Sequence, residues 1–172
     1  MNLDYTRSAM KEHGTAVAEV KERTLVRKSS RTESSIRWEA VDVKEYKEEG
    51  THFRRITRQL LFGEQGGLTT EVRYFEIAPG GHSTFERHEH VHAVIAVHGR
   101  GRLITDEAVH TIQPFDLVNI PPMTWHQFQA EEEAPLGFVC LVPCARDRPI
   151  RPNEQEASEL RAHPHIGPVV RL

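Results

Sequence analysis

The sequence has little cysteine and few aromatic residues. Cys140 and Cys144 are the only cysteines among 172 residues, and aromatic side chains make up 7% of the chain. If both cysteines lie in one extended segment, they are about 13 Å apart, which is too far for a disulfide. Free thiols are typical of a reducing compartment, so we expect a cytoplasmic protein.

Long apolar runs and an excess of positive charge are also missing. No stretch approaches the roughly 20 apolar residues of a membrane span, and the N-terminus lacks the apolar segment of a secretory signal. Lysine and arginine total 22 against 25 aspartate and glutamate residues, which gives a formal net charge of −3. We therefore expect no membrane partner and, because no basic stripe is visible, no nucleic-acid partner.

The chain divides into three parts by composition. Residues 1–37 are polar and charged with weak helical spacing, which predicts an N-terminal arm that is partly mobile or helical. Residues 38–146 alternate short apolar segments with Gly and Pro turns, as expected of an all-β jelly-roll barrel. Residues 147–172 form a C-terminal extension, in which Asn153 is placed to cap a short helix.

Several strands of the barrel can be predicted individually. Residues 136–143 are apolar almost throughout, so this last strand should be central. Alternation places His92, Val94, Ala96 and His98 on the inward face of another strand. The other predicted strands cover residues 53–62, 71–78 (ended by Pro79, Gly80 and Gly81), 102–105, 109–112 and 117–120, and one begins at residue 126.

A run of polar side chains precedes a buried-type strand. Glu86, His88, His90 and His92 occupy alternate positions and lead directly into Ala93-Val94-Ile95-Ala96-Val97. Imidazole and carboxylate groups on one face of a strand are costly to bury without partners. A metal ion removes that cost, because neutral imidazole and carboxylate are its usual ligands. The alternative is a solvated strand edge.

A second stretch supplies one more histidine. Residues 116–126 read as a strand, a Pro121-Pro122 turn and then His126. Together the two stretches resemble the cupin superfamily, whose first motif reads G-x5-H-x-H-x3/4-E-x6-G. Gly80, Glu86, His88, His92 and Gly99 keep every spacing of this motif, with Glu86 and His92 exchanging residue types. In the second motif only Pro121 and His126 match in type.

The resemblance implies a cupin double-stranded β-helix barrel that holds one divalent metal ion per chain. It places the metal ligands at Glu86, His88, His92 and His126, and leaves His90 as an acid/base group at the rim. In the alternative assignment, His88 and His90 form the H-x-H pair and Glu86 is free to act as a base. Manganese is favoured. Iron, nickel, cobalt and zinc are alternatives, because the order of metal affinities alone does not choose among these ions.

A narrower resemblance covers RYFEIAPGGHSTFERHEHVHAV, FDLVNIPPMTWHQF and LGFVCLV followed by ARDRP. These stretches are similar to small bacterial cupins of the methylthioxylulose 5-phosphate methylsulfurylase type. That group uses a thiol to release the methylthio group of its sugar phosphate. The resemblance implies a small phosphorylated keto sugar as substrate, with a thiol as co-substrate. Cys140 is the candidate protein thiol, although an ordinary buried core cysteine is the simpler interpretation.

Candidate substrate contacts lie on the predicted strands. Arg58 and Arg73 each share a face with apolar residues, and an inward guanidinium would suit a phosphate or carboxylate. The alternative is that both arginines lie flat over an outer surface. Phe128 shares a face with His126 and would line the same cavity.

Two other functions remain open from the sequence alone. One is an iron-dependent cupin dioxygenase acting on an aromatic or thiol substrate, and the other is a non-catalytic metal-binding or ligand-binding barrel. Ala93, Ile95 and Val97 are apolar on the face away from the expected metal site. Such a face indicates an association surface, so we also expect a homodimer.

Overall fold

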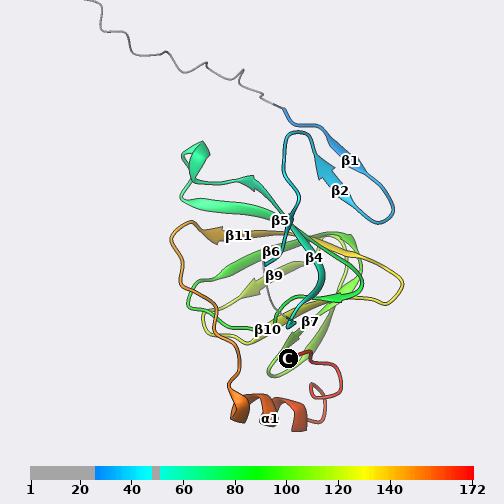
Figure 1. Ribbon diagram of the computed structural model, residues 1–172, viewed down its shortest axis with the longest axis vertical. Helices are drawn as coiled ribbons and strands as arrows, with labels where there is room; N and C mark the ends of the chain where they lie inside the picture. Colours follow the sequence, from blue (N-terminus) through cyan, green and yellow to red (C-terminus); the bar gives the residue numbers. More distant parts are fainter. Residues whose placement is uncertain (1–25, 48–50) are drawn as a thin grey trace, which may run out of the picture.

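The computed structural model describes residues 26–47 and 51–172 (Figure 1). A nine-stranded antiparallel sheet curls into a half-barrel. Its strands are β3 (Lys44–Glu45), β4 (Arg54–Phe62), β5 (Thr70–His82), β6 (His92–Gly99), β7 (Gly101–Thr105), β8 (Val109–Ile112), β9 (Leu117–Ile120), β10 (His126–Ala130) and β11 (Leu136–Pro143).

The order of the strands confirms the expected jelly-roll barrel. The main path is β8-β7-β10-β5-β11-β6-β9, and β4 pairs with β5 on its other side. As predicted, the apolar strand β11 is central, because it pairs with both β5 and β6. A short 3-10 helix, η1 (Glu64–Gly66), connects β4 to β5.

Aromatic side chains fill the interior of the half-barrel. The ring of Phe138 stacks on Phe75 with centroids 5.4 Å apart, and on Phe128 with centroids 4.5 Å apart. Val94 and Ala96 of β6 belong to the same buried cluster, as their predicted inward orientation requires. The largest apolar contacts therefore lie directly beneath the strand ends that carry His92 and His126.

The prediction that His98 points inward with Val94 and Ala96 is wrong. A β-bulge shifts the register between Gly137 and Phe138, so that Gly137 pairs with His98 and Phe138 pairs with Ala96. One extra residue in a strand reverses the alternation beyond it. A Cβ added at Gly137 would meet the Tyr74 hydroxyl and the His98 Cβ atom, so His98 lies on the outer face.

Strand β5 is longer than the sequence indicates. It continues through Pro79, Gly80 and Gly81 to His82, instead of ending at Ala78. Gly80 has a φ of 69°, which glycine adopts without strain. At Gly81 a side chain would collide with the Arg54 carbonyl at 2.6 Å, so glycine permits the close strand contact here. The extension lets His82 pair with β10.

A hairpin formed by β1 (Ser29–Arg31) and β2 (Ile36–Trp38) covers the outer face of β5. The buried carboxylate of Glu76 accepts hydrogen bonds from the Ile36 amide and the Tyr74 hydroxyl, and pairs with Arg37 at 2.8 Å. The N-terminal arm expected over residues 1–37 thus ends in a docked hairpin. Residues 1–25 of that arm lie outside the described residues, and the three-part division stays a prediction.

The helix expected after Asn153 is confirmed as α1 (Glu154–Ala162), at the opposite end of the molecule from the hairpin (Figure 1). Asn153 and Glu156 form a reciprocal capping box. The helix packs through Leu160 into a second apolar cluster with Trp125. No helix in the described ranges is long and apolar enough to cross a bilayer.

The last residues of the chain cover the outer face of β10 next to this cluster. The side-chain amide of Gln127 donates to the Arg171 carbonyl at 2.6 Å, and that of Gln129 donates to the Val169 carbonyl at 2.8 Å. Both glutamines are buried on the outer side of β10. The tail is irregular, as expected, yet it buries Ile166 completely.

Candidate metal centre

Three histidines converge at the mouth of the half-barrel. His88, His92 and His126 each offer a ring nitrogen, and these nitrogens all lie within 4.8 Å of one another. His92 begins β6, His126 begins β10, and His88 lies in the loop before β6. An isolated β-bridge between Glu86 and His126 holds that loop against β10. The strand termini therefore bring together residues that are far apart in the sequence.

Hydrogen bonds fix the orientation of two of the rings. The Nδ1 atom of His88 donates to the His90 carbonyl at 2.7 Å, and the Nδ1 atom of His126 donates to the Thr124 carbonyl at 2.9 Å. With the proton on Nδ1, the Nε2 atom carries a free lone pair. The Nε2 atom of His88 is buried and has no hydrogen-bond partner within the described chain.

The surroundings keep these imidazoles uncharged. Burial lowers the pKa of His126 to about 4, and burial followed by the charges of His126 and His88 lowers the pKa of His92 to about 2. Burial, then the neighbouring His90, also lowers the pKa of His88. A histidine binds a metal ion only when its imidazole is neutral. The buried and unpaired Nε2 atom, the fixed ring orientations and the lowered pKa values together fit a divalent transition metal.

Glu86 lies beside this triad but is turned toward other partners. Its two carboxylate oxygens accept hydrogen bonds from the Tyr46 hydroxyl at 3.1 Å and the Lys47 ammonium at 2.7 Å. Burial, then the charge of Glu86, raises the pKa of Tyr46 well above its usual value. Tyr46 and Lys47 could not be predicted as site residues, since a Tyr-Lys pair in a charged segment carries no recognisable pattern.

His90 lies against the triad from the other side. Its ring stacks on His88 with centroids 3.7 Å apart, and its Nε2 atom is 3.2 Å from the Nε2 atom of His92. Its Nδ1 atom is 2.5 Å from a carboxylate oxygen of Asp147. Asp147 was not predicted either, because it lies 57 positions from His90 along the chain and contacts it only through the fold.

A small cavity continues from the triad into the core. Its volume is about 30 Å³, and His92, His126, Phe128 and Cys140 are among its lining residues. This is room for roughly one water molecule, whereas small-molecule pockets measure about 300 Å³ or more. Any ligand larger than a water molecule would therefore have to bind at the mouth rather than within this cavity.

Cys140 lines the cavity but is not an activated thiol in this structure. Its side chain is 2% exposed, and burial raises its pKa to about 12, although the charge of Arg73 opposes this change. A thiol is nucleophilic only as the thiolate. Cys140 is therefore positioned near the triad, while its protonation state in this environment favours the inert form.

The two candidate arginines lie on inward-facing positions near the mouth. Arg73 shares its face of β5 with Phe75 and pairs across the sheet with Cys140. It forms an ion pair with Glu71. Arg58 is half-buried, and burial followed by the charge of Arg73 lowers its pKa. Arg58 has no hydrogen-bond or ion-pair partner among the described residues, so it is the less committed cation of the two.

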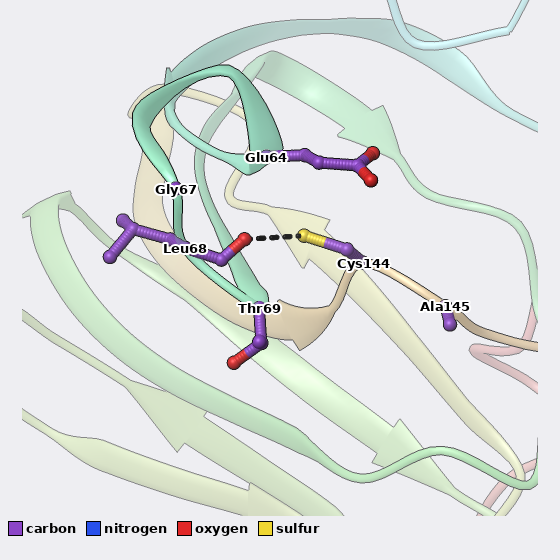
Figure 2. Close-up of a pocket in the computed structure, with 6 residues that line it drawn as sticks. All are labelled: Glu64, Gly67, Leu68, Thr69, Cys144 and Ala145. Atoms are coloured by element: carbon purple, nitrogen blue, oxygen red, sulfur yellow. Dashed lines mark hydrogen bonds between the residues drawn. The ribbon is translucent and has the colours of Figure 1, made fainter.

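A larger hollow on the surface lies beside the other cysteine. It has a volume of about 500 Å³ and is lined by Glu64, Gly67, Leu68, Thr69, Cys144 and Ala145. Figure 2 shows the Cys144 thiol directed at the Leu68 carbonyl, to which it donates at 3.4 Å. Despite its size, this hollow has one carboxylate and one thiol and no group of histidines. The side chains suited to binding a metal lie at the triad instead.

Comparisons with known proteins agree with this geometry. The cupin domain family matches residues 73–142. The 1-methylthio-D-xylulose 5-phosphate methylsulfurylase of Rhodospirillum rubrum is 50% identical over 131 residues, which cover 76% of this chain and 83% of that protein. This relative is a named enzyme, and the shared stretch includes most of the chain.

Two solved structures show the same arrangement of strands. A cupin-2 domain from Rhodospirillum rubrum has a TM-score of 0.72 and 48% identity, and covers 78% of this chain and 90% of its own. A cupin 2 conserved barrel domain protein from Rhodopseudomonas palustris has a TM-score of 0.76 and 43% identity, and covers 84% of this chain and 99% of its own. With its antiparallel half-barrel and its histidine triad at the mouth, the chain belongs to the cupin family.

Proposed function

We propose that this protein is a metal-dependent enzyme that releases methanethiol from 1-methylthio-D-xylulose 5-phosphate. The observation that carries the proposal is a histidine triad at the mouth of a chain that is 50% identical to a methylsulfurylase. An α-hydroxyketone such as this sugar phosphate offers two adjacent oxygens for chelation. A divalent cation held there would act as a Lewis acid that polarises the carbonyl at C2.

His88, His92 and His126 would hold the cation through nitrogen atoms. Two side chains compete for the fourth protein position. The spacing of the cupin motif favours Glu86, which would have to exchange its contacts with Tyr46 and Lys47 for the cation. The separation of 3.2 Å between the Nε2 atoms of His90 and His92 favours His90, because adjacent ligands on one ion lie about 3 Å apart at bond lengths of about 2.1 Å.

The phosphate needs a cation near the mouth, and Arg58 is the better candidate. Arg73 is already paired with Glu71, whereas Arg58 lies half-buried beside the positive charge of Arg73. An anion placed between the two guanidinium groups would relieve their mutual repulsion and form charge-assisted hydrogen bonds. Phe128 would pack against the carbon chain of the sugar.

The reaction requires two thiol equivalents. A thiolate attacks the methylthio sulfur, the C1–S bond breaks, and its electron pair passes to C1–C2. Protonation of C1 completes the deoxy sugar. A second thiol then attacks the mixed disulfide formed between the first thiol and the methylthio group, which releases methanethiol. Cys140 would supply the first thiol only if its pKa falls from about 12, and otherwise an added thiol does so. His90 would exchange the proton at the rim.

Three finer features belong to the same proposal. Manganese is the favoured ion. Iron, nickel, cobalt and zinc are the alternatives, because mixed nitrogen and oxygen donors suit all of these ions without selecting among them. The protein would act in the cytoplasm, where Cys140 and Cys144 stay reduced. It would form a homodimer through the outer face of β6.

The central experiment measures methanethiol released from the methylthio sugar phosphate, with and without an added thiol. The metal-loaded protein should release it, and His126→Ala should lose both the metal and the activity. His110→Ala is the matched control, because His110 is an exposed histidine on β8. Full metal occupancy in His126→Ala would refute the triad. If no methanethiol forms under any condition, the dioxygenase and binding-barrel hypotheses take precedence, and oxygen uptake with bound iron separates them.

A second experiment identifies the fourth ligand. Metal dissociation constants are measured by titration calorimetry for Glu86→Gln and His90→Gln. The variant that removes a ligand should bind metal at least tenfold more weakly, and the other should keep the wild-type affinity. Wild-type metal affinity in both variants would leave only the three histidines as protein ligands.

A further inference from the structure

Asp147 joins the segment after β11 to the loop that carries the histidines. One carboxylate oxygen lies 2.5 Å from the His90 Nδ1 atom and accepts the His90 amide at 3.2 Å. The other oxygen accepts the Glu89 amide at 2.8 Å. Three donors from two consecutive residues therefore converge on one carboxylate, which is only a quarter exposed.

The segment that carries Asp147 is held at both ends. On the β11 side, the Cys144 amide donates to the Thr69 carbonyl at 2.9 Å, and Arg146 forms an ion pair with Glu71 at 3.3 Å. On the α1 side, Ile150 and Arg87 exchange two backbone hydrogen bonds of 2.8 and 3.0 Å. The carboxylate is thus presented to His90 by a segment that is already fixed.

We infer that Asp147 is a positioning residue that holds His90 with its proton on Nδ1 and its Nε2 lone pair directed at His92. A carboxylate only accepts hydrogen bonds, so the ring nitrogen that faces Asp147 must be the donor. In the neutral ring the Nε2 atom is then unprotonated. This is the carboxylate–histidine arrangement that orients rings around metal sites and raises their basicity.

The inference rests on the proposed function only for its effect on catalysis. His90 needs a bare Nε2 atom whether it accepts the substrate proton or binds the ion. Without Asp147, the loop loses three hydrogen bonds and the ring is free to rotate or to change tautomer. We expect Asp147→Ala to lower kcat by roughly 10- to 100-fold, or to weaken metal binding by the same factor if His90 is a ligand.

The test is the tautomer of His90, read from long-range 15N–1H NMR spectra of the full-length protein in chelator at pH 8, where no ion competes with Asp147 for control of the ring. The His90 signals are assigned by their loss in His90→Gln. The wild-type ring should carry its proton on Nδ1, and Asp147→Ala should show a mixture of tautomers or the Nε2-protonated form. Asp147→Asn keeps an oxygen that accepts from Nδ1, so it should restore most of the wild-type spectrum.

Glu89→Gln is the matched control, because it removes a neighbouring negative charge from an exposed side chain that does not touch His90. It should leave the tautomer and kcat unchanged. An Asp147→Ala protein with wild-type His90 signals would overturn the inference, as would a Glu89→Gln protein with the altered ones. If wild-type protein releases no methanethiol but Asp147→Ala still changes the tautomer, the proposed function falls and the positioning role stands.

Discussion

At the scale of single residues, the two thiols of this protein have opposite environments. Cys140 is 2% exposed, and burial raises its pKa to about 12, whereas Cys144 lies half-buried at the edge of a surface hollow. Because alkylation needs an accessible thiolate, iodoacetamide at pH 8 should label the native protein once, at Cys144. Intact-mass measurement gives the number of labels, and denatured protein should take two.

Single substitutions identify the labelled thiol. Native Cys140→Ser should still take one label, and native Cys144→Ser should take none on the same timescale. Labelling of Cys140 in the native protein as fast as in the denatured protein would contradict the burial argument. Such a result would also strengthen Cys140 as the attacking thiol.

The metal-free protein should lose stability as the pH falls. Burial lowers the pKa of His126 from 6.5 to about 4, so the unfolded chain binds a proton at a higher pH than the folded protein does. Stability from this group is therefore complete above pH 6.5 and is lost progressively as the pH falls toward 4. Thermal melts in chelator from pH 8 to pH 4 should show this loss.

The matched variant in the melts is His126→Gln, which cannot be protonated at this position. Its melting temperature should fall less steeply between pH 6.5 and pH 4 than that of the wild-type protein. His110→Ala, on the surface, should follow the wild-type curve. Identical slopes in all three proteins would show that His126 does not control the acid sensitivity.

Residue spacing predicted the histidines of the site better than their partners. His88, His92 and His126 were found from the sequence because the spacing of the cupin motif and a Pro-Pro turn are local patterns, although His88 lies in a loop and not on the expected strand. Lys47 and Asp147 could not be found in this way. Their contacts with Glu86 and His90 span 39 and 57 positions and depend on how loops close over the barrel.

At the scale of elements, helix α1 depends on its cap. The side chain of Asn153 accepts from the Glu156 amide, and the Glu156 carboxylate accepts from the Asn153 amide, both at 2.9 Å. Asn153→Ala should lower the free energy of unfolding by about 0.5–2 kcal/mol. Urea titration followed by tryptophan fluorescence measures this change, since Trp125, one of the two tryptophans, belongs to the cluster beneath the helix.

Gln155→Ala provides the comparison for the cap. Gln155 is an exposed position in the same turn, and alanine has the higher helix propensity. The stability of this variant should equal or slightly exceed that of the wild-type protein. A loss in Gln155→Ala as large as that in Asn153→Ala would mean that the cap has no special role.

The strands show which part of an element the sequence determines. Most strand positions and the central place of β11 followed from apolar patterns and turn residues. The outward turn of His98 did not, because a bulge depends on the register between two strands rather than on either strand alone. Likewise, β5 continues past Pro79 because Gly80 adopts a positive φ and Gly81 permits close contact with β4.

At the scale of the whole molecule, one face of the barrel is apolar and is not covered by any of the residues that the structure describes. Leu117 on the edge strand β9 is 79% exposed, and its cross-strand partner Ile95 is 38% exposed. Phe115, 83% exposed, lies next to them. We expect this face to form the homodimer interface, so sedimentation at micromolar concentration should show a dimer that Leu117→Lys converts to a monomer.

A control for the dimer uses another exposed apolar residue. Leu68 lies near Cys144, at the surface hollow of Figure 2, and Leu68→Lys should leave the dimer intact. A wild-type monomer under these conditions would contradict the prediction. A dimer broken by Leu68→Lys but not by Leu117→Lys would show that the interface lies on the face that carries Leu68.

The overall fold and the cluster of three histidines were predictable from two short motifs, because a cupin barrel places both at one mouth. The docking of the hairpin onto Glu76 was not predictable, since its partners come from β2 and β5 and are 40 residues apart. The assembly state also depends on a second copy of the chain, about which one sequence gives only an apolar face.

The cover that the C-terminal tail gives to the outer face of β10 has a consequence for biosynthesis. Gln127 and Gln129 need the carbonyls of Arg171 and Val169 to satisfy their buried amides. During translation, β10 emerges from the ribosome some forty residues before those acceptors do. The outer face of β10 therefore keeps two unsatisfied amides until residue 171 has left the exit tunnel, so this part of the barrel is completed only after synthesis of the chain's last residues.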